Sequence, residues 1–207
     1  MDPRWRRLHD LAMRQRGHVA TRQVEATGLT RPALRYQVRA GLVEPVMRGV
    51  YRFTTFPPGE QEREAAILLW AGADVGVVAA FSHETALQHY ELTDAFPAKL
   101  HLTVPQGFRK RAPSDVVLRH ADLGPDDVHR EGLLAYTTPA RMFLDLLAAG
   151  SPVEPLRDAY QEAVRRGLVR RGTFEGSRPR VGAYADVTAT AHAVDLRDRL
   201  ARLIEEG

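Results

Sequence analysis

Three short helical patterns and a glycine turn follow one another near the start of the chain, and this order limits the folds open to it. Pro3 begins an amphipathic pattern that Gly17 stops, and a second short pattern runs from Arg22 to Thr27. Gly28 suits a tight turn because glycine adopts a positive φ at little cost. Thr30 precedes the third pattern as an N-cap. The sequence therefore predicts a helix–turn–helix.

Two strand patterns come next, at Leu42 to Val46 and at Val50 to Phe53, around the turn Met47-Arg48-Gly49. A helix, a helix–turn–helix and a hairpin in this order are typical of a winged helix–turn–helix. We predict this domain for residues 1–53, followed by a Pro/Gly linker.

Residues 60–168 mix helical and strand patterns, which predicts a second domain of α+β class. Helices are expected to begin near Glu62, at Ser82, at Thr138-Pro139 and after Ser151. Strands are expected at Val75 to Phe81, Leu100 to Val104, Val116 to His120 and Leu133 to Tyr136. Residues 169–207 are predicted to form an irregular linker and a final helix from about Ala189 to Ile204.

Charge separates the two parts of the chain. The formal net charge of the 207 residues is +3, from 29 basic and 26 acidic side chains. Residues 1–52 hold 11 arginines and 4 acidic residues, a balance of +7, which leaves −4 for the remainder. A basic head joined to a mildly acidic body suggests a module that binds a polyanion.

The third predicted helix is the strongest candidate for that contact. With Leu34 and Val38 on its buried side, Arg35, Tyr36 and Arg39 lie round toward the opposite side. Long donors on the exposed side of such a helix can reach guanine edges or phosphates in the major groove. The predicted DNA-contacting residues are Arg22, Thr30, Arg31, Arg35, Tyr36, Arg39, Arg48 and Arg52. The alternative for each arginine is a solvated surface position, and RNA is disfavoured because only Tyr36 and Tyr51 offer exposed aromatic platforms.

In the second domain, Ser82, Thr138 and Arg141 are considered as the lining of a polar groove for a partner. Ordinary structural roles are the alternative. Ser82 would be an N-cap whose side chain points away from His83, and Arg141 would form a surface ion pair with Asp145, four residues on.

The sequence also points away from several functions. It contains no cysteine, no phosphate-cradling GxxxxGK[ST] loop, no histidines at ligand spacing and no apolar stretch long enough to span a membrane. We therefore expect no cofactor, no metal, no catalytic residues and a cytoplasmic location. A partner-binding module, or a nucleotidyl- or phosphoryl-transfer enzyme, with an incidentally basic N-terminus remains the alternative.

A family resemblance rests on motifs spread over residues 5–165. The segment from Arg16 to Phe53 carries a G-x-V-x-T turn, a glycine seven residues later and a G-V-Y-R ending, and three further motifs follow: FSHETAL, LHLTVP and TTPARMFLDLL. The matching residues of the first segment are Gly17, Val19, Thr21, Gly28, Leu29, Gly49, Val50, Tyr51 and Arg52. The chain resembles AbiEi-type antitoxins and related winged-helix regulators of type IV toxin–antitoxin systems.

The resemblance implies a repressor that binds inverted repeats in the operator of its own operon. It also implies that the second domain opposes a nucleotidyltransferase-type toxin. Two half-sites require two heads, supplied by a dimer or by monomers that bind cooperatively.

Overall fold

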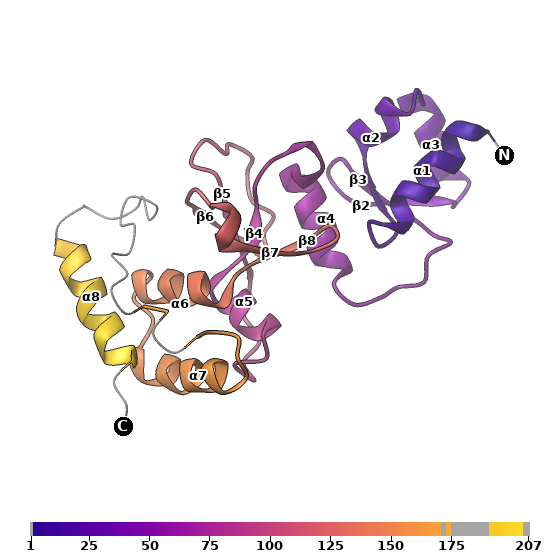
Figure 1. The fold of residues 1–207 in the computed structure, drawn as a ribbon. Coiled ribbons are helices and arrows are strands. Elements are labelled where there is room, and N and C mark those ends of the chain that lie inside the picture. Colours follow the sequence, from indigo (N-terminus) through magenta and orange to yellow (C-terminus); the bar gives the residue numbers. More distant parts are fainter. Residues whose placement is uncertain (1, 171–172, 175–190, 205–207) are drawn as a thin grey trace. The chain divides into compact units, whose positions relative to one another are not determined.

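A computed structural model describes residues 2–170, 173–174 and 191–204 (Figure 1). The chain divides into two compact units. The first comprises Met1–Val77 with Arg130–Ala135, and the second comprises Val78–His129 with Tyr136–Gly207. Both contain helices and strands, so the predicted α+β class is confirmed.

Three helices begin the first unit: α1 (Pro3–Met13), α2 (Thr21–Ala26) and α3 (Arg31–Arg39). Each buries one apolar stripe, as the sequence predicts. The shared core contains Leu8, Ala12, Val19, Val24, Leu29, Leu34, Val43 and Phe53. Thr21 is the first residue of α2, one position before the start expected from the sequence. Gln23 Oε1 accepts from the amide of the preceding Ala20 at 2.9 Å.

A three-stranded antiparallel sheet completes the framework of this unit. Strands β2 (Val43–Met47) and β3 (Val50–Phe53) form the expected hairpin. A third strand, β1 (His18–Ala20), pairs with β3 and was not expected. Its three residues are all buried, so no alternation of polar and apolar positions marks it as a strand.

Helix α4 (Glu62–Ala71) and the short 3₁₀ helix η1 (Ala73–Val75) also belong to the first unit. Every residue from Ala65 to Ala71 is buried, and α4 contacts β1, β2 and β3. The first unit therefore extends past the domain end that we predicted at residue 53, because α4 covers the small sheet.

A five-stranded mixed sheet forms the framework of the second unit, although Arg130–Ala135, from the end of β7 to the start of β8, are grouped with the first unit. Its strands are β4 (Ala80–Phe81), β5 (Leu100–Val104), β6 (Val116–His120), β7 (Val128–Glu131) and β8 (Leu134–Thr137), in the order β6-β5-β4-β8-β7. The 3₁₀ helix η2 (Pro125–Asp127) precedes β7. The strand expected at Val75 to Phe81 is shortened to two residues, because η1 takes up its beginning. Strand β7 was not expected.

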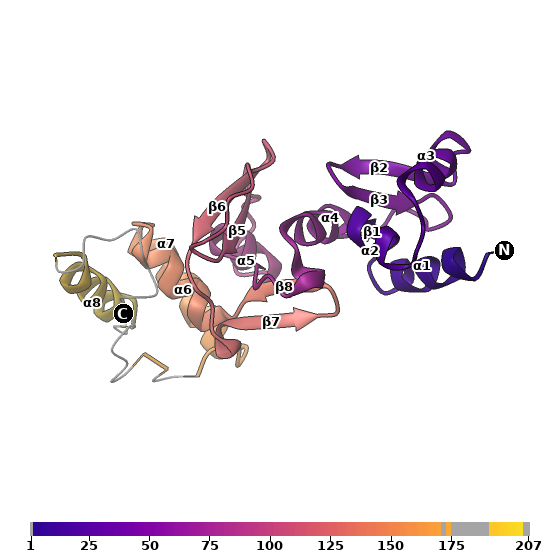
Figure 2. The same cartoon turned by 90° about the horizontal axis from the view of Figure 1, so that it is seen from above.

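Four helices accompany this sheet: α5 (His83–His89), α6 (Pro139–Ala148), α7 (Val153–Arg165) and α8 (Ala191–Ile204). Helix α8 packs against α6 and α7 (Figure 2). The helical core includes Met142, Phe143, Leu146, Leu156, Tyr160, Leu200 and Leu203. Most of the expected linker at residues 169–190 lies outside the described residues.

Candidate nucleic-acid interface

The turn between α2 and α3 has the geometry that its sequence predicts. Gly28 adopts φ +80°, and the Thr27 amide bonds to the carbonyls of Gln23 and Val24, which closes α2. Thr30 then caps α3, since its Oγ1 accepts from the Ala33 amide at 3.3 Å. The cap and the buried side chain of Leu34 fix which side of α3 faces outward.

The outward side of α3 carries Arg35, Tyr36 and Arg39. All three side chains are exposed, and Tyr36 is 68% exposed. Among the described residues, none of them forms a side-chain hydrogen bond or ion pair. Two guanidinium groups and a phenol are thus available to a ligand that approaches this side of the helix.

Arg31, the first residue of α3, is also exposed but has a partner. Its Nε lies 2.6 Å from Oε1 of Glu25 on α2. Both side chains are accessible to water, so a phosphate group can compete with this carboxylate.

The tip of the β2–β3 hairpin carries Arg48. Its side chain is exposed, and it has no side-chain partner within the described parts of the chain. Gly49 follows with φ +79°, which the reversal of the chain requires. Arg48 therefore forms a second exposed cation on this unit.

Two of the predicted contact residues are instead engaged inside the first unit. Arg22 donates to the carboxylate of Asp74, at 2.9 Å from Nε, and to the Leu69 carbonyl at 2.5 Å. The side chain of Arg52 is only 13% exposed and pairs with Glu44 at 2.6 Å. These two arginines cross-link the unit, so they add little free positive charge to its surface.

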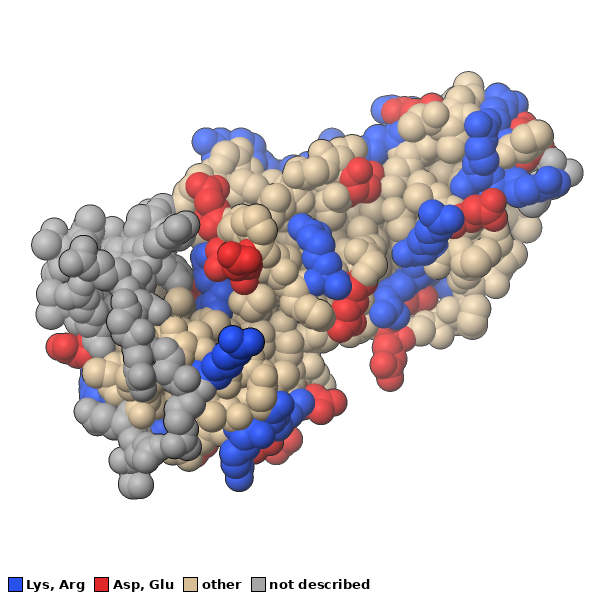
Figure 3. Space-filling model, in the orientation of Figure 1, with Lys and Arg blue, Asp and Glu red and all other residues tan. Residues whose placement is uncertain are grey.

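The space-filling view shows basic side chains, which in this unit are all arginines, over the first unit with acidic side chains between them (Figure 3). Three further arginines, two on α1 and one at its C-cap, are exposed and have no side-chain partner among the described residues. They are Arg6, Arg7 and Arg14. We assigned them no role from the sequence, because a basic helical face without a buried partner has no distinguishing pattern.

The polar groove considered for the second unit does not match its geometry. Ser82 and Arg141 are buried, at 0% and 3% exposure, and only Thr138 is partly exposed. Arg141 donates to Asp145 at 2.8 Å and to Asp127 at 2.9 Å. The Arg141–Asp145 pair is thus part of the interior and not a surface ion pair.

Ser82 and His83 also differ from expectation, because their side chains meet. Ser82 Oγ lies 2.9 Å from His83 Nδ1 and accepts from Thr103 Oγ1 at 2.7 Å, so it does not cap α5. His83 has φ +54°, and this left-handed backbone turns its ring toward Ser82.

Burial shifts the pKa values of His83 and Asp145 in the interior of the second unit. Desolvation, with the nearby positive charges of Arg119, His101 and Arg141, lowers the pKa of His83 to about 3. Desolvation likewise raises the pKa of Asp145 to about 6, against the opposing attraction of Arg141. A neutral, enclosed histidine is poorly suited to general acid–base catalysis at neutral pH.

Metal binding finds no support in the described residues, where no three His, Asp or Glu side chains lie together as ligands. Helices long and apolar enough to cross a membrane are likewise absent from the described segments.

A capped helix that presents two unpaired arginines, beside a hairpin with a third, is the surface expected of a small DNA-binding regulator. Comparison with known families agrees. Residues 6–54, from α1 through β3, match the family model described as "Transcriptional regulator, AbiEi antitoxin". The resemblance seen in the sequence is thereby confirmed for this segment, and the description names a regulator rather than an enzyme.

The fold as a whole has a counterpart among solved structures. The crystal structure of the RV2827C protein from Mycobacterium tuberculosis aligns with a TM-score of 0.51 over 99% of this chain and 81% of that chain. The sequence identity is 18%, so the likeness concerns the fold alone. No curated protein matches the sequence significantly.

Proposed function

We propose that the first unit is a winged helix–turn–helix that binds double-stranded operator DNA and regulates transcription. Helix α3 enters the major groove, where Arg35, Tyr36 and Arg39 face the base edges. The single observation that carries this proposal is the unpaired, exposed state of these side chains on a helix that Thr30 caps. An α-helix with its side chains is about 10–12 Å across, which suits a major groove about 12 Å wide.

The other cations serve the phosphate backbone. Arg48 on the hairpin tip contacts a phosphate beside the groove, and Arg31 does so after it leaves Glu25. Phosphate contacts fix the register of a protein on the duplex, whereas base contacts select the sequence. Arg22 and Arg52 support this surface from within, through Asp74 and Glu44.

A head with a single recognition helix reads one half-site. We therefore propose that the operator contains inverted repeats and that two heads bind it, as a dimer or as cooperating monomers. A regulator of this kind acts in the cytoplasm.

The family description supports a second role, as an antitoxin. The match ends at residue 54, within the unit that we propose binds DNA. We therefore assign the antitoxin role to the second unit. We propose that this unit opposes a nucleotidyltransferase-type toxin of a type IV system.

DNA binding is tested by fluorescence anisotropy of the full chain with a labelled duplex from the region upstream of its gene. Arg35→Ala should weaken specific binding by about 1–3 kcal/mol, since a guanidinium contact with a base is lost. Arg165→Ala is the matched control, because it removes an equally exposed arginine from α7 in the second unit. If the double variant R35A/R39A binds the duplex as tightly as the unchanged protein, α3 is not the recognition helix.

A further inference from the structure

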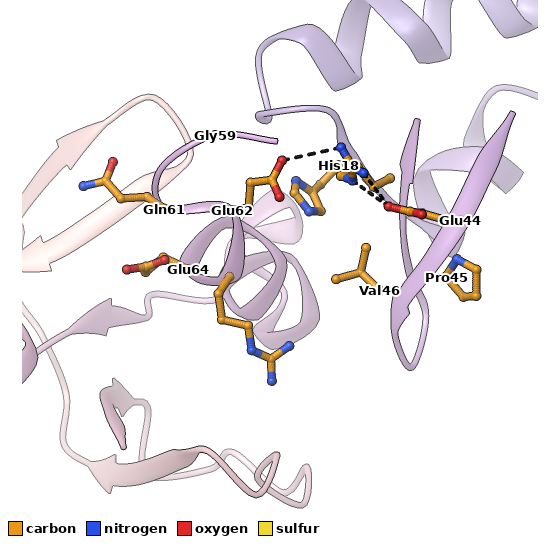
Figure 4. A pocket seen from close by; sticks show the side chains of 10 residues that line it. His18, Glu44, Pro45, Val46, Gly59, Gln61, Glu62 and Glu64 are labelled. Atoms are coloured by element: carbon orange, nitrogen blue, oxygen red, sulfur yellow. Dashed lines mark hydrogen bonds and ion pairs between the residues drawn. The ribbon is translucent and has the colours of Figure 1, made fainter. Parts of the chain in front are cut away.

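A hollow of about 630 Å³ opens in the first unit, next to the hairpin and the start of α4. Its walls come from all three strands of the small sheet and from the segment that leads into α4 (Figure 4). The lining residues are His18, Glu44, Pro45, Val46, Arg52, Gly59, Gln61, Glu62, Arg63 and Glu64. Arg52, which the structure shows to be paired inside the first unit, is the one lining residue among the DNA contacts predicted from the sequence.

His18 gives this hollow a defined hydrogen-bonding requirement. Its side chain is fully buried, and Nδ1 lies 2.8 Å from the Arg16 carbonyl. A carbonyl oxygen only accepts, so Nδ1 must carry the hydrogen. Burial lowers the pKa of His18, so the ring is neutral and Nε2 holds a lone pair. Nε2 has no hydrogen-bond partner among the described residues.

Such an acceptor is expected to be satisfied by water or by a ligand, because buried polar atoms are rarely left unpaired. The partner must present an N–H or O–H group, or be a metal ion. A metal ion is disfavoured, since no three suitable side chains lie together in the described residues.

The charges around the hollow favour a cation. Two carboxylates, those of Glu44 and Glu62, lie around one guanidinium group, that of Arg52, whereas Glu64 projects from the other side of α4. Arg52 is already shared between Glu44 at 2.6 Å and Glu62 at 3.6 Å. Dashed lines in Figure 4 mark the ion pairs of these two glutamates. Glu64 forms no ion pair within the described parts of the chain.

Two residues near the rim have an unusual backbone conformation, and side-chain hydrogen bonds hold this part of the chain in place. Arg16 and Gln61 adopt φ values of +54° and +59°, in the left-handed region that non-glycine residues avoid. The Arg16 guanidinium bonds to the Glu60 carbonyl at 3.1 Å and to Gln61 Oε1 at 2.9 Å. Strain of this kind persists where surrounding contacts maintain it, and it is frequent at ligand sites.

We propose that this hollow binds a small organic cation with N–H donors, a primary amine or a guanidinium compound. One N–H group donates to Nε2 of His18, and the carboxylate of Glu62 balances the charge. The proposal concerns the first unit alone and does not depend on DNA binding.

Isothermal titration calorimetry of the full chain, without DNA, tests this proposal with putrescine and agmatine as probes. One equivalent of at least one probe should bind. Tetramethylammonium has the same kind of charge but no N–H group, so it should bind at least about tenfold more weakly. Equal binding of all three cations would show non-specific attraction and overturn the proposal, as would the absence of binding.

Matched variants locate the site. Glu62→Gln should weaken amine binding by about tenfold, whereas Glu64→Gln, on the other side of α4, and Glu60→Gln, which removes an exposed charge outside the hollow, should leave it unchanged. Since replacement of the buried His18 can unfold the protein, its contact is followed by ¹⁵N NMR of the unchanged chain. The Nε2 resonance of His18 should move when the amine binds. An unchanged Nε2 resonance at saturation, or equal loss of affinity in E60Q and E62Q, contradicts the assignment.

Discussion

Arg22 on α2 donates from both Nε and Nη2 to the carboxylate of Asp74, a residue 52 positions further along the chain. The Asp74 side chain is only 6% exposed, and Arg22 also reaches the Leu69 carbonyl at 2.5 Å. Helix α2 is thereby tied to the end of α4 and to the following η1. Paired, charge-assisted hydrogen bonds of this kind fix geometry as well as adding stability.

This pair should contribute measurably to the stability of the first unit. We expect Arg22→Ala and Asp74→Ala each to lower the free energy of unfolding by about 1–3 kcal/mol, because each leaves a partly buried charge without its partner. Urea denaturation of both single variants and the double variant measures the coupling between them. Purely additive effects would show that the two side chains do not interact in solution.

Arg48 should act on DNA through charge alone. Arg48→Ala is expected to weaken binding to operator and unrelated duplexes alike and to reduce the salt dependence by about one released ion. Anisotropy titrations at several salt concentrations give the slope. A variant that loses affinity only for the operator would place Arg48 on a base edge instead.

Glu25 should weaken DNA binding, because its carboxylate competes with phosphate groups for Arg31. Glu25→Gln removes the carboxylate that lies 2.6 Å from Arg31 Nε, so the guanidinium becomes free for a phosphate. We expect tighter DNA binding and a salt dependence steeper by about one ion. Glu154→Gln, an exposed change on α7, is the control for a general effect of net charge. Unaltered affinity in E25Q would mean that Arg31 stays away from the duplex.

Asp145 should make the stability of the chain depend on pH. Burial raises its pKa to about 6, above the value of about 4 expected in the unfolded chain. The folded state therefore binds more protons between these values, and the free energy of unfolding falls as pH rises from 4 to 6. From this group alone the fall is on the order of 2–3 kcal/mol, with no further change at higher pH.

Carboxyl-carbon NMR gives the pKa of Asp145 directly in the unchanged protein. Asp145→Asn should remove this part of the pH dependence, and Asp126→Asn, an exposed change on the neighbouring η2, should retain it. A midpoint near 4 for Asp145 would show that its pairing with Arg141 outweighs burial.

Much of the fold could be predicted because local patterns are strong where one face of an element is buried. Helix α3, with Thr30 before it and Leu34 on its inner side, follows from capping and periodicity alone. Strand β1 could not be predicted, since three buried residues show no alternation. Helix α4 was expected, but its membership of the first unit depends on tertiary contacts that no local pattern encodes.

The candidate site was predictable in part for the same reason. Periodicity identifies the outward side of α3, so Arg35, Tyr36 and Arg39 are found exposed as expected. Whether an arginine is free depends on carboxylates that are distant in sequence, as Asp74 is from Arg22. Ser82 and His83 were misjudged because neighbouring side chains diverge on a regular helix, whereas His83 has a left-handed backbone.

The position of α4 has a practical consequence for protein engineering. A chimera that borrows the head of this protein must carry Glu62–Ala71 with it, because a junction after Phe53 would strip the small sheet of its cover. The Pro/Gly segment between them is then an internal loop of the transplanted module, whose first stretch of chain runs to Val77.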